Sequence, residues 1–341
     1  MLEILSLRNA EAARWQTYVD HLPFDLRDVC YTPAYARVQY HLGPVYAAVG
    51  IYGGSFVLQP FTIRDGKCLD ISSFYGGGGP VTNSDFFDYR EFDAEFSQWR
   101  QKNNIVCEYC QLNPLMYEHQ RSLIGDAIPL EKTRDAVLVC LNYPEDELFK
   151  KFSRNRRRSI KGAQDRGVKV TRCADVKTFA SMYKLSMNRL KANERWNYPD
   201  AIWRSYLLEL GPERSSLFKA FLPDNTIESM LLVIHGYGKA YAHFLASNAH
   251  DSNDLLYFEA MKWCHDAGIN IMSLGGGLTG AEDDPLLSYK AGFSTLRGPV
   301  YTYKRIFDGA AYSQASNGST SDFFPAYRAD NNADSAPPHP A

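Results

Sequence analysis

The sequence predicts an α/β (α+β) protein made of two tandem halves, each a mixed twisted sheet flanked by helices. Two observations carry this prediction. In the first third, short runs of alternating apolar and polar residues are separated by glycine-containing turns. From about residue 145 onward, stretches with helical spacing alternate with short apolar runs, in an order that repeats the outline of the first third. We therefore expect domains at residues 1–145 and 146–310.

The first half is expected to open with a helix near residues 10–21. Strands follow near 45–51, 55–63 and 68–74, with Gly53-Gly54 and Asp65-Gly66 between them as hairpin turns. A glycine run at 76–79, a helix over 85–102 and a strand over 105–112 come next.

The second half is expected to begin with one helix that starts after Pro144 and carries the basic run from residue 150 to 169. The further elements expected are a strand at 168–172, helices at 176–190 and 199–210, strands at 217–222, 227–234 and 240–246, a helix at 254–267, a strand at 269–274, and a final pair of strands. Lys290 is placed on one of these last strands. Because residues 311–341 are rich in Ser, Asn, Asp, Ala and Pro, we expect a disordered tail there without a catalytic role.

The composition is that of a globular protein, with 45% hydrophobic and 22% charged residues and a net charge of −2. This balance argues against a general nucleic-acid coat protein but leaves room for a local basic patch. No apolar run approaches the ~18 residues of a membrane-spanning helix, and the N-terminus lacks the layout of a secretory signal. The seven cysteines follow no disulfide pattern, and Cys107 and Cys110 have no second pair to complete a zinc site. We expect a soluble cytoplasmic protein without a metal.

Nine basic side chains lie between residues 150 and 169, against one acid, Asp165. Helical spacing directs one set of side chains to the core, Phe149, Phe152, Arg156, Ile160 and Ala163. It directs the other set outward, Arg154, Arg157, Arg158 and Lys161. The outward set is either a solvated helix face or a binding site for a polyanion, such as tRNA or a substrate with a diphosphate.

A second segment with possible chemistry joins the helix at 254–267 to the strand at 269–274, the glycines that follow it, and Lys290. The glycine-rich stretch at 275–280 lacks the Gly-Lys-Ser/Thr ending of a P-loop and the dinucleotide fingerprint, which argues against a nucleotide loop. Without further support it is a plain helix–strand unit with a tight turn.

Four segments together resemble the Fem-type, peptidoglycan-bridge branch of the GNAT acyltransferase superfamily. They are the basic segment at 152–163, the helix ending in Arg189, the turn Leu274-Gly275-Gly276, and Tyr289-Lys290-Ala291-Gly292-Phe293. The step Gly79-Pro80-Val81 in the first half is also similar. The resemblance implies two GNAT-like domains. It also implies transfer of an amino acid from aminoacyl-tRNA to an amine of a peptide or cell-envelope precursor, with no cofactor besides the tRNA co-substrate.

The resemblance implies that Lys290 lies near the 3′ end of the acyl donor and that Arg189 contacts substrate phosphates. A positive group at Lys290 is sensible chemistry, because ester aminolysis develops negative charge on the carbonyl oxygen or the leaving alkoxide. His243 is a candidate base or substrate contact, or else an ordinary core histidine. Tyr75, Tyr241 and Tyr289 are further candidates for substrate binding.

Two positions depart from the pattern of that branch. Its members often carry a lysine that grips the diphosphate of a wall precursor, where this chain has Gln39, and an acidic residue where it has Asn83. Both residues stay candidates for substrate contact. The two changes nevertheless weaken the case for a nucleotide-linked wall precursor as the acceptor.

Two other functions stay open. One is transfer of an acyl group from CoA or a carrier protein. It is disfavoured because the segment at 247–254, where a CoA-binding turn is expected, has no glycine and two acids. The other is a tRNA- or peptide-binding module without activity. The sequence identifies neither the transferred group, nor the acceptor, nor the oligomeric state.

Overall fold

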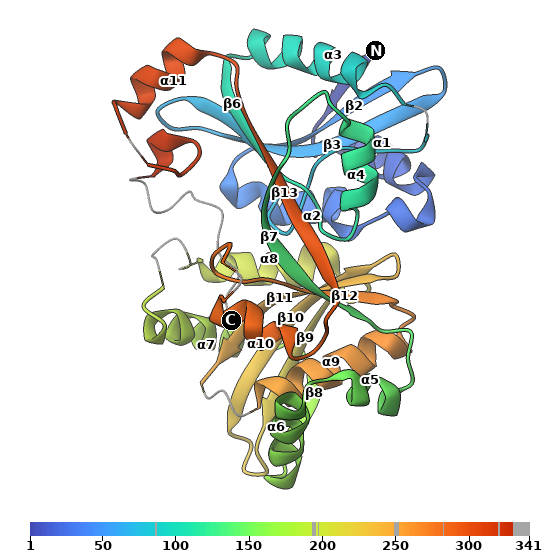
Figure 1. Ribbon diagram of the computed structural model, residues 1–341, viewed down its shortest axis with the longest axis vertical. Coiled ribbons are helices and arrows are strands. Elements are labelled where there is room, and N and C mark those ends of the chain that lie inside the picture. Colours follow the sequence, from blue (N-terminus) through green and yellow to red (C-terminus); the bar gives the residue numbers. More distant parts are fainter. Residues whose placement is uncertain are drawn as a thin grey trace. The chain divides into compact units, whose positions relative to one another are not determined.

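The computed structural model describes residues 1–85, 87–192, 196, 198–248, 252–281, 283–319 and 321–329 (Figure 1). Within these residues the chain divides into an N-terminal unit, residues 1–133 with 300–329, and a C-terminal unit, residues 134–299. Strands β7 (Glu131–Cys140) and β13 (Arg297–Ile306) each contribute residues to both units. The predicted boundaries at 145 and 310 therefore differ from the observed division, because β13 returns the chain to the N-terminal unit.

The N-terminal unit is built on a mixed sheet with the strand order β1-β2-β3-β4-β6-β13, and with β5 paired to β3. Its other strands are β1 (Leu2–Leu5), β2 (Val45–Tyr52), β3 (Ser55–Arg64), β4 (Leu69–Ser72), β5 (Val81–Thr82) and β6 (Ile105–Gln111). The predicted β2–β3 hairpin is confirmed. Its turn needs glycine because Gly53 and Gly54 have φ angles of 56° and 88°.

The helices of this unit are α1 (Asn9–His21), α2 (Pro33–Gln39), α3 (Tyr89–Lys102), α4 (Tyr117–Ile124) and α11 (Gly309–Ser316), with short 3₁₀ turns between some of them. Helix α3 begins later than the predicted residue 85 because Asp88 caps it, accepting a hydrogen bond from the Arg90 amide at 3.0 Å. Phe92 and Phe96 of α3 pack on Val57 and Phe61 of the sheet.

The expectation of a disordered tail from residue 311 is wrong for the part that the structure describes. Helix α11 ends at Ser316, and Tyr327 and Arg328 are buried. Both side chains donate hydrogen bonds to the Asp70 carboxylate, at 2.8 and 2.6 Å. The composition of this segment gave no sign that Tyr327 and Arg328 would be buried. Residues 330–341, also assigned to the tail, lie outside the described residues.

The sheet of the C-terminal unit has the order β7-β12-β11-β10-β9-β8. Its other strands are β8 (Lys169–Cys173), β9 (Ser215–Phe221), β10 (Ile227–Gly236), β11 (Lys239–Ser247) and β12 (Ile271–Gly276). β11 and β12 are parallel, and helix α9 (Asn253–Asp266) connects them. The pairing of β10 with β11 shifts register between Leu232 and Val233, where His243 is passed over. Such bulges re-aim side chains and recur beside active sites.

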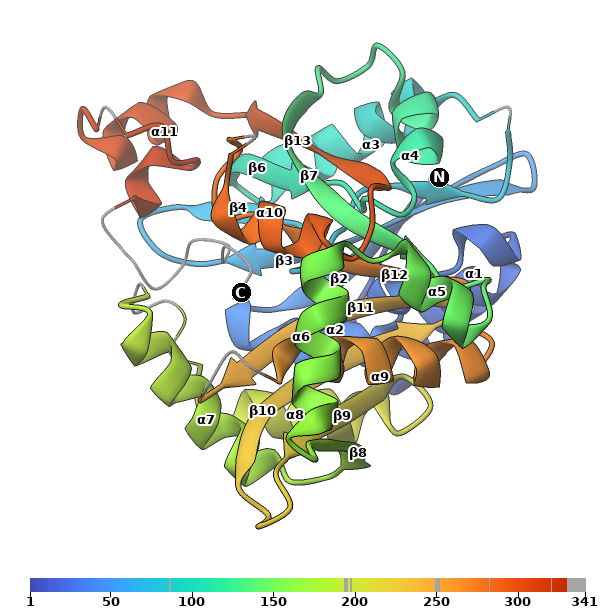
Figure 2. The ribbon, with the colours of Figure 1, turned by 60° about the horizontal axis from the view of Figure 1, so that its bottom comes forward.

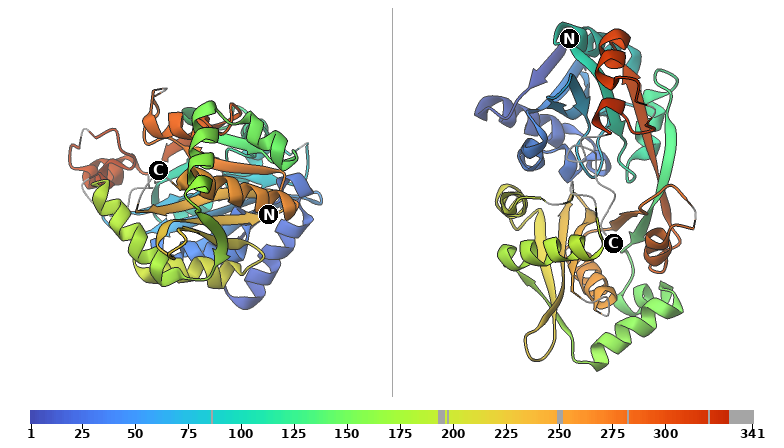
Figure 3. Two further views of the ribbon diagram at one scale, coloured as in Figure 1. Left: turned by 90° about the horizontal axis from the view of Figure 1, so that it is seen from below. Right: turned by 90° about the vertical axis from the view of Figure 1, so that its left-hand side faces the viewer.

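Helices cover both faces of this sheet (Figures 2 and 3). They are α5 (Glu145–Lys151), α6 (Arg154–Asp165), α7 (Val176–Arg189), α8 (Asp200–Leu210), α9 and α10 (Pro285–Ala291). One apolar core joins the sheet to α6 and α9 through residues such as Val233, Ala242, Ile160, Leu256 and Met261. Aromatic side chains of α7 and α8 pack instead around Phe244 of β11. The predicted mixed sheet flanked by helices is confirmed.

Two local predictions in this unit are wrong. The single helix after Pro144 is divided into α5 and α6, because the Ser153 side chain caps α6 by accepting a hydrogen bond from the Arg156 amide. Lys290 lies on helix α10 and not on a strand. The pair Asp284-Pro285 starts that helix, with Asp284 as its N-cap and Pro285 in the first turn.

Candidate functional site

Three of the four motif segments meet inside the C-terminal unit. The Ser153 amide at the start of α6 donates a hydrogen bond to the Gly292 carbonyl at 2.7 Å. A Cβ at Gly292 would lie 2.8 Å from Cγ of Arg156, so this close approach requires glycine. The Lys290 amine donates to the Gly276 carbonyl at 2.9 Å. These contacts join three segments: the basic helix α6, the glycine turn after β12, and residues 289–292.

Lys290 is the most unusual ionisable group of this cluster. Its side chain is 1% exposed. Its pKa is lowered from 10.5 to about 7, mainly by burial and also by the positive charge of Arg134, while the negative charge of Asp284 opposes the shift. An amine with a pKa near neutrality is present in both charged and neutral forms at physiological pH, which suits a group that accepts and donates protons.

A carboxylate holds the two flanking motifs together beside Lys290. Asp254, in the first turn of α9, accepts hydrogen bonds from Nη1 of Arg156 at 2.7 Å and from the Tyr289 hydroxyl at 2.6 Å. The Arg156 guanidinium also lies over the Tyr289 ring, 4.4 Å from its centroid. Burial and the negative charge of Asp254 raise the pKa of Tyr289 well above its usual value. Tyr289 is therefore a neutral hydrogen-bond donor here.

His243 and Tyr241 lie on β11. His243 is buried and hydrogen-bonded through Nε2 to the Tyr206 hydroxyl of α8 at 2.8 Å. Burial lowers its pKa to about 3, so the ring is neutral. Tyr241 is also buried, and its backbone pairs with Ser273 of β12.

Arg189, the fourth motif, ends α7 at the edge of the sheet. It is exposed, and its guanidinium donates a hydrogen bond to the Asn248 carbonyl just beyond β11. One turn earlier, Ser186 exchanges two hydrogen bonds of 2.8 Å with the backbone of Ser247. The last turn of α7 is thus fixed to the end of β11, and the Arg189 side chain remains open to solvent.

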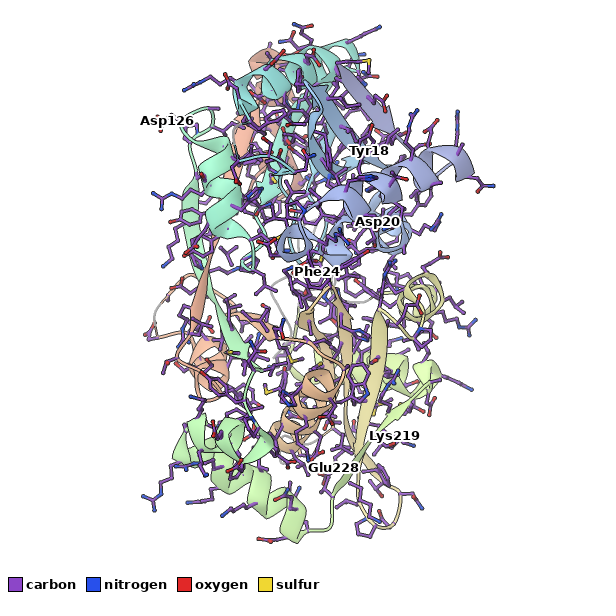
Figure 4. The ribbon with its side chains drawn as sticks, turned by 90° about the vertical axis from the view of Figure 1, so that its right-hand side faces the viewer. Tyr18, Asp20, Phe24, Asp126, Lys219 and Glu228 are labelled. Atoms are coloured by element: carbon purple, nitrogen blue, oxygen red, sulfur yellow. The ribbon has the colours of Figure 1, made fainter. Side chains whose placement is uncertain are left out.

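The outward face of α6 agrees with the prediction. Arg154, Arg158 and Lys161 are exposed and Arg157 is half-buried, while Ile160 and Ala163 are fully buried. The next basic residue, Arg166, forms an ion pair with Glu228, which is labelled in Figure 4. The exposed basic residues therefore lie along α6 itself, whose course can be followed in Figure 2.

Two candidate residues of the N-terminal unit accept hydrogen bonds from its backbone. Gln39 is fully buried and its Oε1 accepts a hydrogen bond from the Tyr75 amide at 3.2 Å, which brings these two predicted residues together. Oδ1 of Asn83 accepts from the Phe56 amide at 2.8 Å. Neither contact involves a charged group.

The glycine run at 76–79 is close-packed. Cβ atoms at Gly77 and Gly79 would lie 2.9 Å from Cα of Asn113 and 2.5 Å from a methyl carbon of Leu112. Gln120 of α4 donates to the Gly78 carbonyl at 2.6 Å. The glycines therefore allow α4 and β6 to approach this loop.

All seven cysteines are free thiols. Cys107 and Cys110 are buried, and burial raises the pKa of the Cys107 thiol to about 12. Among the described residues, no group of three His, Cys, Asp or Glu side chains is placed to hold a metal ion.

Sequence reasoning missed two carboxylates of the site, Asp254 and Asp284. Asp254 was counted only as an acid that disfavours CoA, although it stands directly before an apolar helical run. For Asp284 the signal was the Asp-Pro pair before Leu286, a typical helix start. Both residues are nearly fully buried, at 1% and 2% exposure.

The start of α9 bears on the choice of donor, because a CoA-binding turn is expected before this helix. Ser252, Asn253 and Asp254 are buried there, and the first turn of the helix already carries the Asp254 carboxylate, which is paired with Arg156. This part of the segment offers no exposed amides for a pyrophosphate. Residues 249–251 of the same segment lie outside the described residues.

Comparison with known protein families indicates which class of protein the C-terminal unit resembles. Residues 150–291, which contain α6, β11, α9, β12 and Lys290, match the profile of an acetyltransferase (GNAT) domain. Residues 150–291 of the C-terminal unit therefore resemble GNAT-type acyltransferase domains in sequence.

The particular branch follows from a second match. Residues 85–197 match the profile of the FemAB family, so the resemblance to the Fem-type branch of this superfamily is confirmed. No curated protein matches the chain in sequence.

Solved structures share the fold at low sequence identity. FemX is 13% identical with a TM-score of 0.64, over 92% of this chain and 99% of FemX. A conserved protein of unknown function from Bacteroides thetaiotaomicron is 12% identical with a TM-score of 0.63, over 90% of this chain and 100% of that chain. The C-terminal domain of a putative lysylphosphatidylglycerol synthetase from Agrobacterium fabrum is 15% identical with a TM-score of 0.51, over 92% of this chain and 96% of that domain.

No helix in the described part of the chain is both long and apolar enough to cross a membrane.

Proposed function

We propose that this protein transfers an aminoacyl group from aminoacyl-tRNA to an amine of a peptide or peptide-like acceptor, such as a cell-envelope precursor. The observation that carries the proposal is the buried Lys290 amine, with its pKa of about 7, at the junction of three Fem-type motifs. No cofactor besides the aminoacyl-tRNA co-substrate is part of it. Such a donor implies that transfer takes place in the cytoplasm.

In the proposed reaction, the neutral acceptor amine attacks the ester carbonyl of the donor. The new C–N bond forms, the ester C–O bond breaks, and a proton from the amine passes to the leaving ribose oxygen. Lys290 in its neutral form accepts that proton and in its charged form donates it to the leaving oxygen. In the free protein the amine is buried and donates a hydrogen bond to the Gly276 carbonyl, which fixes its position.

Two features favour tRNA as the donor. The exposed face of α6 carries Arg154, Arg158 and Lys161, a row of charge suited to a phosphate backbone. The start of α9, where CoA would bind, is buried and carries the Asp254 carboxylate. Among similar structures, FemX and a domain of a putative lysylphosphatidylglycerol synthetase suggest peptide and lipid acceptors as the first classes to test.

Acyl-CoA-dependent N-acylation is the second candidate, because residues 150–291 match an acetyltransferase domain. The two donors are separated by one assay. The purified protein is incubated with a mixture of charged tRNAs, or with acetyl-CoA, and with peptide and lipid amines. Transfer that RNase abolishes supports the proposal. RNase-resistant transfer that requires CoA overturns it in favour of the alternative.

A further inference from the structure

Asp284 connects the two segments that enclose Lys290. One carboxylate oxygen, Oδ1, accepts hydrogen bonds from the amides of Leu286 and Leu287 at the start of α10, both at 2.9 Å. The other, Oδ2, accepts from the amides of Leu278 and Thr279 in the glycine turn, at 2.8 and 2.7 Å. The Thr279 hydroxyl adds a fifth bond at 3.0 Å.

This arrangement exceeds what helix capping requires. A capping side chain satisfies the free amides of its own helix, as Oδ1 does here. The bonds to Oδ2 come from the turn that follows β12, the strand that ends at Gly276. A Cβ at Gly277 would lie 2.5 Å from Cγ of Asp284, so the turn approaches the carboxylate as closely as only glycine permits.

We propose that Asp284 is a positioning residue for Lys290: it fastens the glycine turn to the first turn of α10 and so holds the Lys290 amine at the Gly276 carbonyl. The proposal deepens the proposed function, since it rests on the role of Lys290 in transfer. The positions of the Lys290 amine and of the Gly276 carbonyl that it contacts both depend on the Asp284 side chain. Gly276 directly precedes the turn that Asp284 binds, and Lys290 lies on the helix that Asp284 caps.

Charge gives Asp284 a second effect on the same amine. The charged groups that act on Lys290 are Arg134 of β7, which lowers its pKa, and Asp284, which raises it. Burial would raise the pKa of Asp284 itself, but the bonds from Leu287, Thr279 and Leu278 outweigh burial and lower it, so the group is a carboxylate. Removal of this charge should lower the pKa of Lys290 further.

The decisive test measures Lys290 directly. Protein labelled at the lysine side chains is titrated by NMR, and the Lys290 signal is assigned by its loss in Lys290→Met. Two variants are compared with the wild type. Asp284→Asn removes the charge, and Asp284→Ser keeps a capping hydroxyl for α10 but cannot reach both segments. We expect the Lys290 midpoint to fall by roughly one pH unit in both.

The kinetic arm uses the transfer assay above. In both variants kcat should fall roughly tenfold or more, with KM for the donor within about twofold of wild type, since the defect is in alignment and not in binding. The pH limb that belongs to Lys290 should move to lower pH. The matched control is Asp308→Ser at the cap of α11, where the carboxylate accepts from the Ala311 amide of its own helix. It should change neither readout.

A purely structural role predicts a lower melting temperature with an unshifted Lys290 midpoint and unchanged kcat, and that result overturns the proposal. Failure of the proposed function has a different signature. If the wild type transfers nothing from any charged tRNA, the transferase proposal fails, while the NMR titration still decides whether Asp284 controls the amine.

Discussion

The two units differ in how they use the residues that the sequence marked as functional. In the C-terminal unit, Lys290, Tyr289 and the basic helix meet a buried carboxylate and a glycine turn, and the pKa of Lys290 falls to about 7. In the N-terminal unit, Gln39 and Asn83 each accept a hydrogen bond from a backbone amide of their own unit. Neither of these two contacts involves a charge.

The comparison indicates which half of the chain carries the chemistry, although the two halves have a similar order of helices and strands. A buried lysine whose pKa has fallen close to neutrality, among residues of three shared motifs, is a candidate for acid–base chemistry. A buried amide that accepts a backbone hydrogen bond stabilises the fold and needs no further explanation. We therefore expect substitutions in the C-terminal unit to affect transfer and those in the N-terminal unit to affect stability.

The largest effect is expected from Lys290→Met. Loss of a group that moves a proton should lower kcat by about 10²-fold to 10³-fold. Stability at pH 7 should be retained, because an apolar chain of similar length replaces a buried amine. Single-turnover transfer and thermal unfolding measure the two quantities. Full activity in Lys290→Met would remove the central residue from the account.

The next effect is expected from Asp254→Ala, which leaves Arg156 and the Tyr289 hydroxyl without their shared acceptor. Breaking this largely buried ion pair should lower the free energy of unfolding by about 3 kcal/mol. Urea denaturation measures it. The control is Asp165→Ala, which removes an exposed acid of α6 and should change stability by less than about 0.5 kcal/mol. Equal stabilities for the two variants would contradict the role given to Asp254.

A smaller effect is expected on the basic face of α6. Arg158→Glu combined with Lys161→Glu should weaken tRNA binding by roughly tenfold and reduce its salt dependence. Filter binding at several salt concentrations gives both values. The control is Lys102→Glu, which makes the same change of charge at a single exposed lysine of the N-terminal unit. Binding unaffected by the α6 changes would show that this face is only solvated.

The smallest effect is expected from Asn83→Ala. The Phe56 amide loses its acceptor, so the free energy of unfolding should fall by about 1 kcal/mol, while kcat and KM stay at wild-type values. Unfolding curves and the transfer assay on one preparation decide this. A rise in KM for the acceptor with unchanged stability would show instead that Asn83 contacts substrate. Residues of both units would then affect transfer.

Much of the architecture could be predicted because the relevant signals are local. The strands β2, β3 and β4 and the glycine turn between β2 and β3 are confirmed, as is the buried side of α6 at Ile160 and Ala163. Lys290 was found by its motif. Its environment was not, since α10 is one short helix whose start depends on an Asp-Pro pair in a stretch of glycines and acids.

The long-range contacts could not be predicted for a physical reason. Asp254 and Arg156 are 98 residues apart in sequence, and Tyr327 and Asp70 are 257 apart. Periodicity reports which side of an element faces the core, but not which polar group it meets there. For the same reason the chain after residue 311 was expected to be disordered, although Tyr327 and Arg328 are buried on Asp70.

Proton transfer by Lys290, whose pKa is about 7, is tested by the pH dependence of single-turnover transfer. The wild-type rate should therefore show a limb with an apparent pKa near 7, and this limb should be absent from the residual rate of Lys290→Met. A wild-type rate that stays constant between about pH 6 and pH 8, or a limb that persists unchanged in the variant, would contradict it.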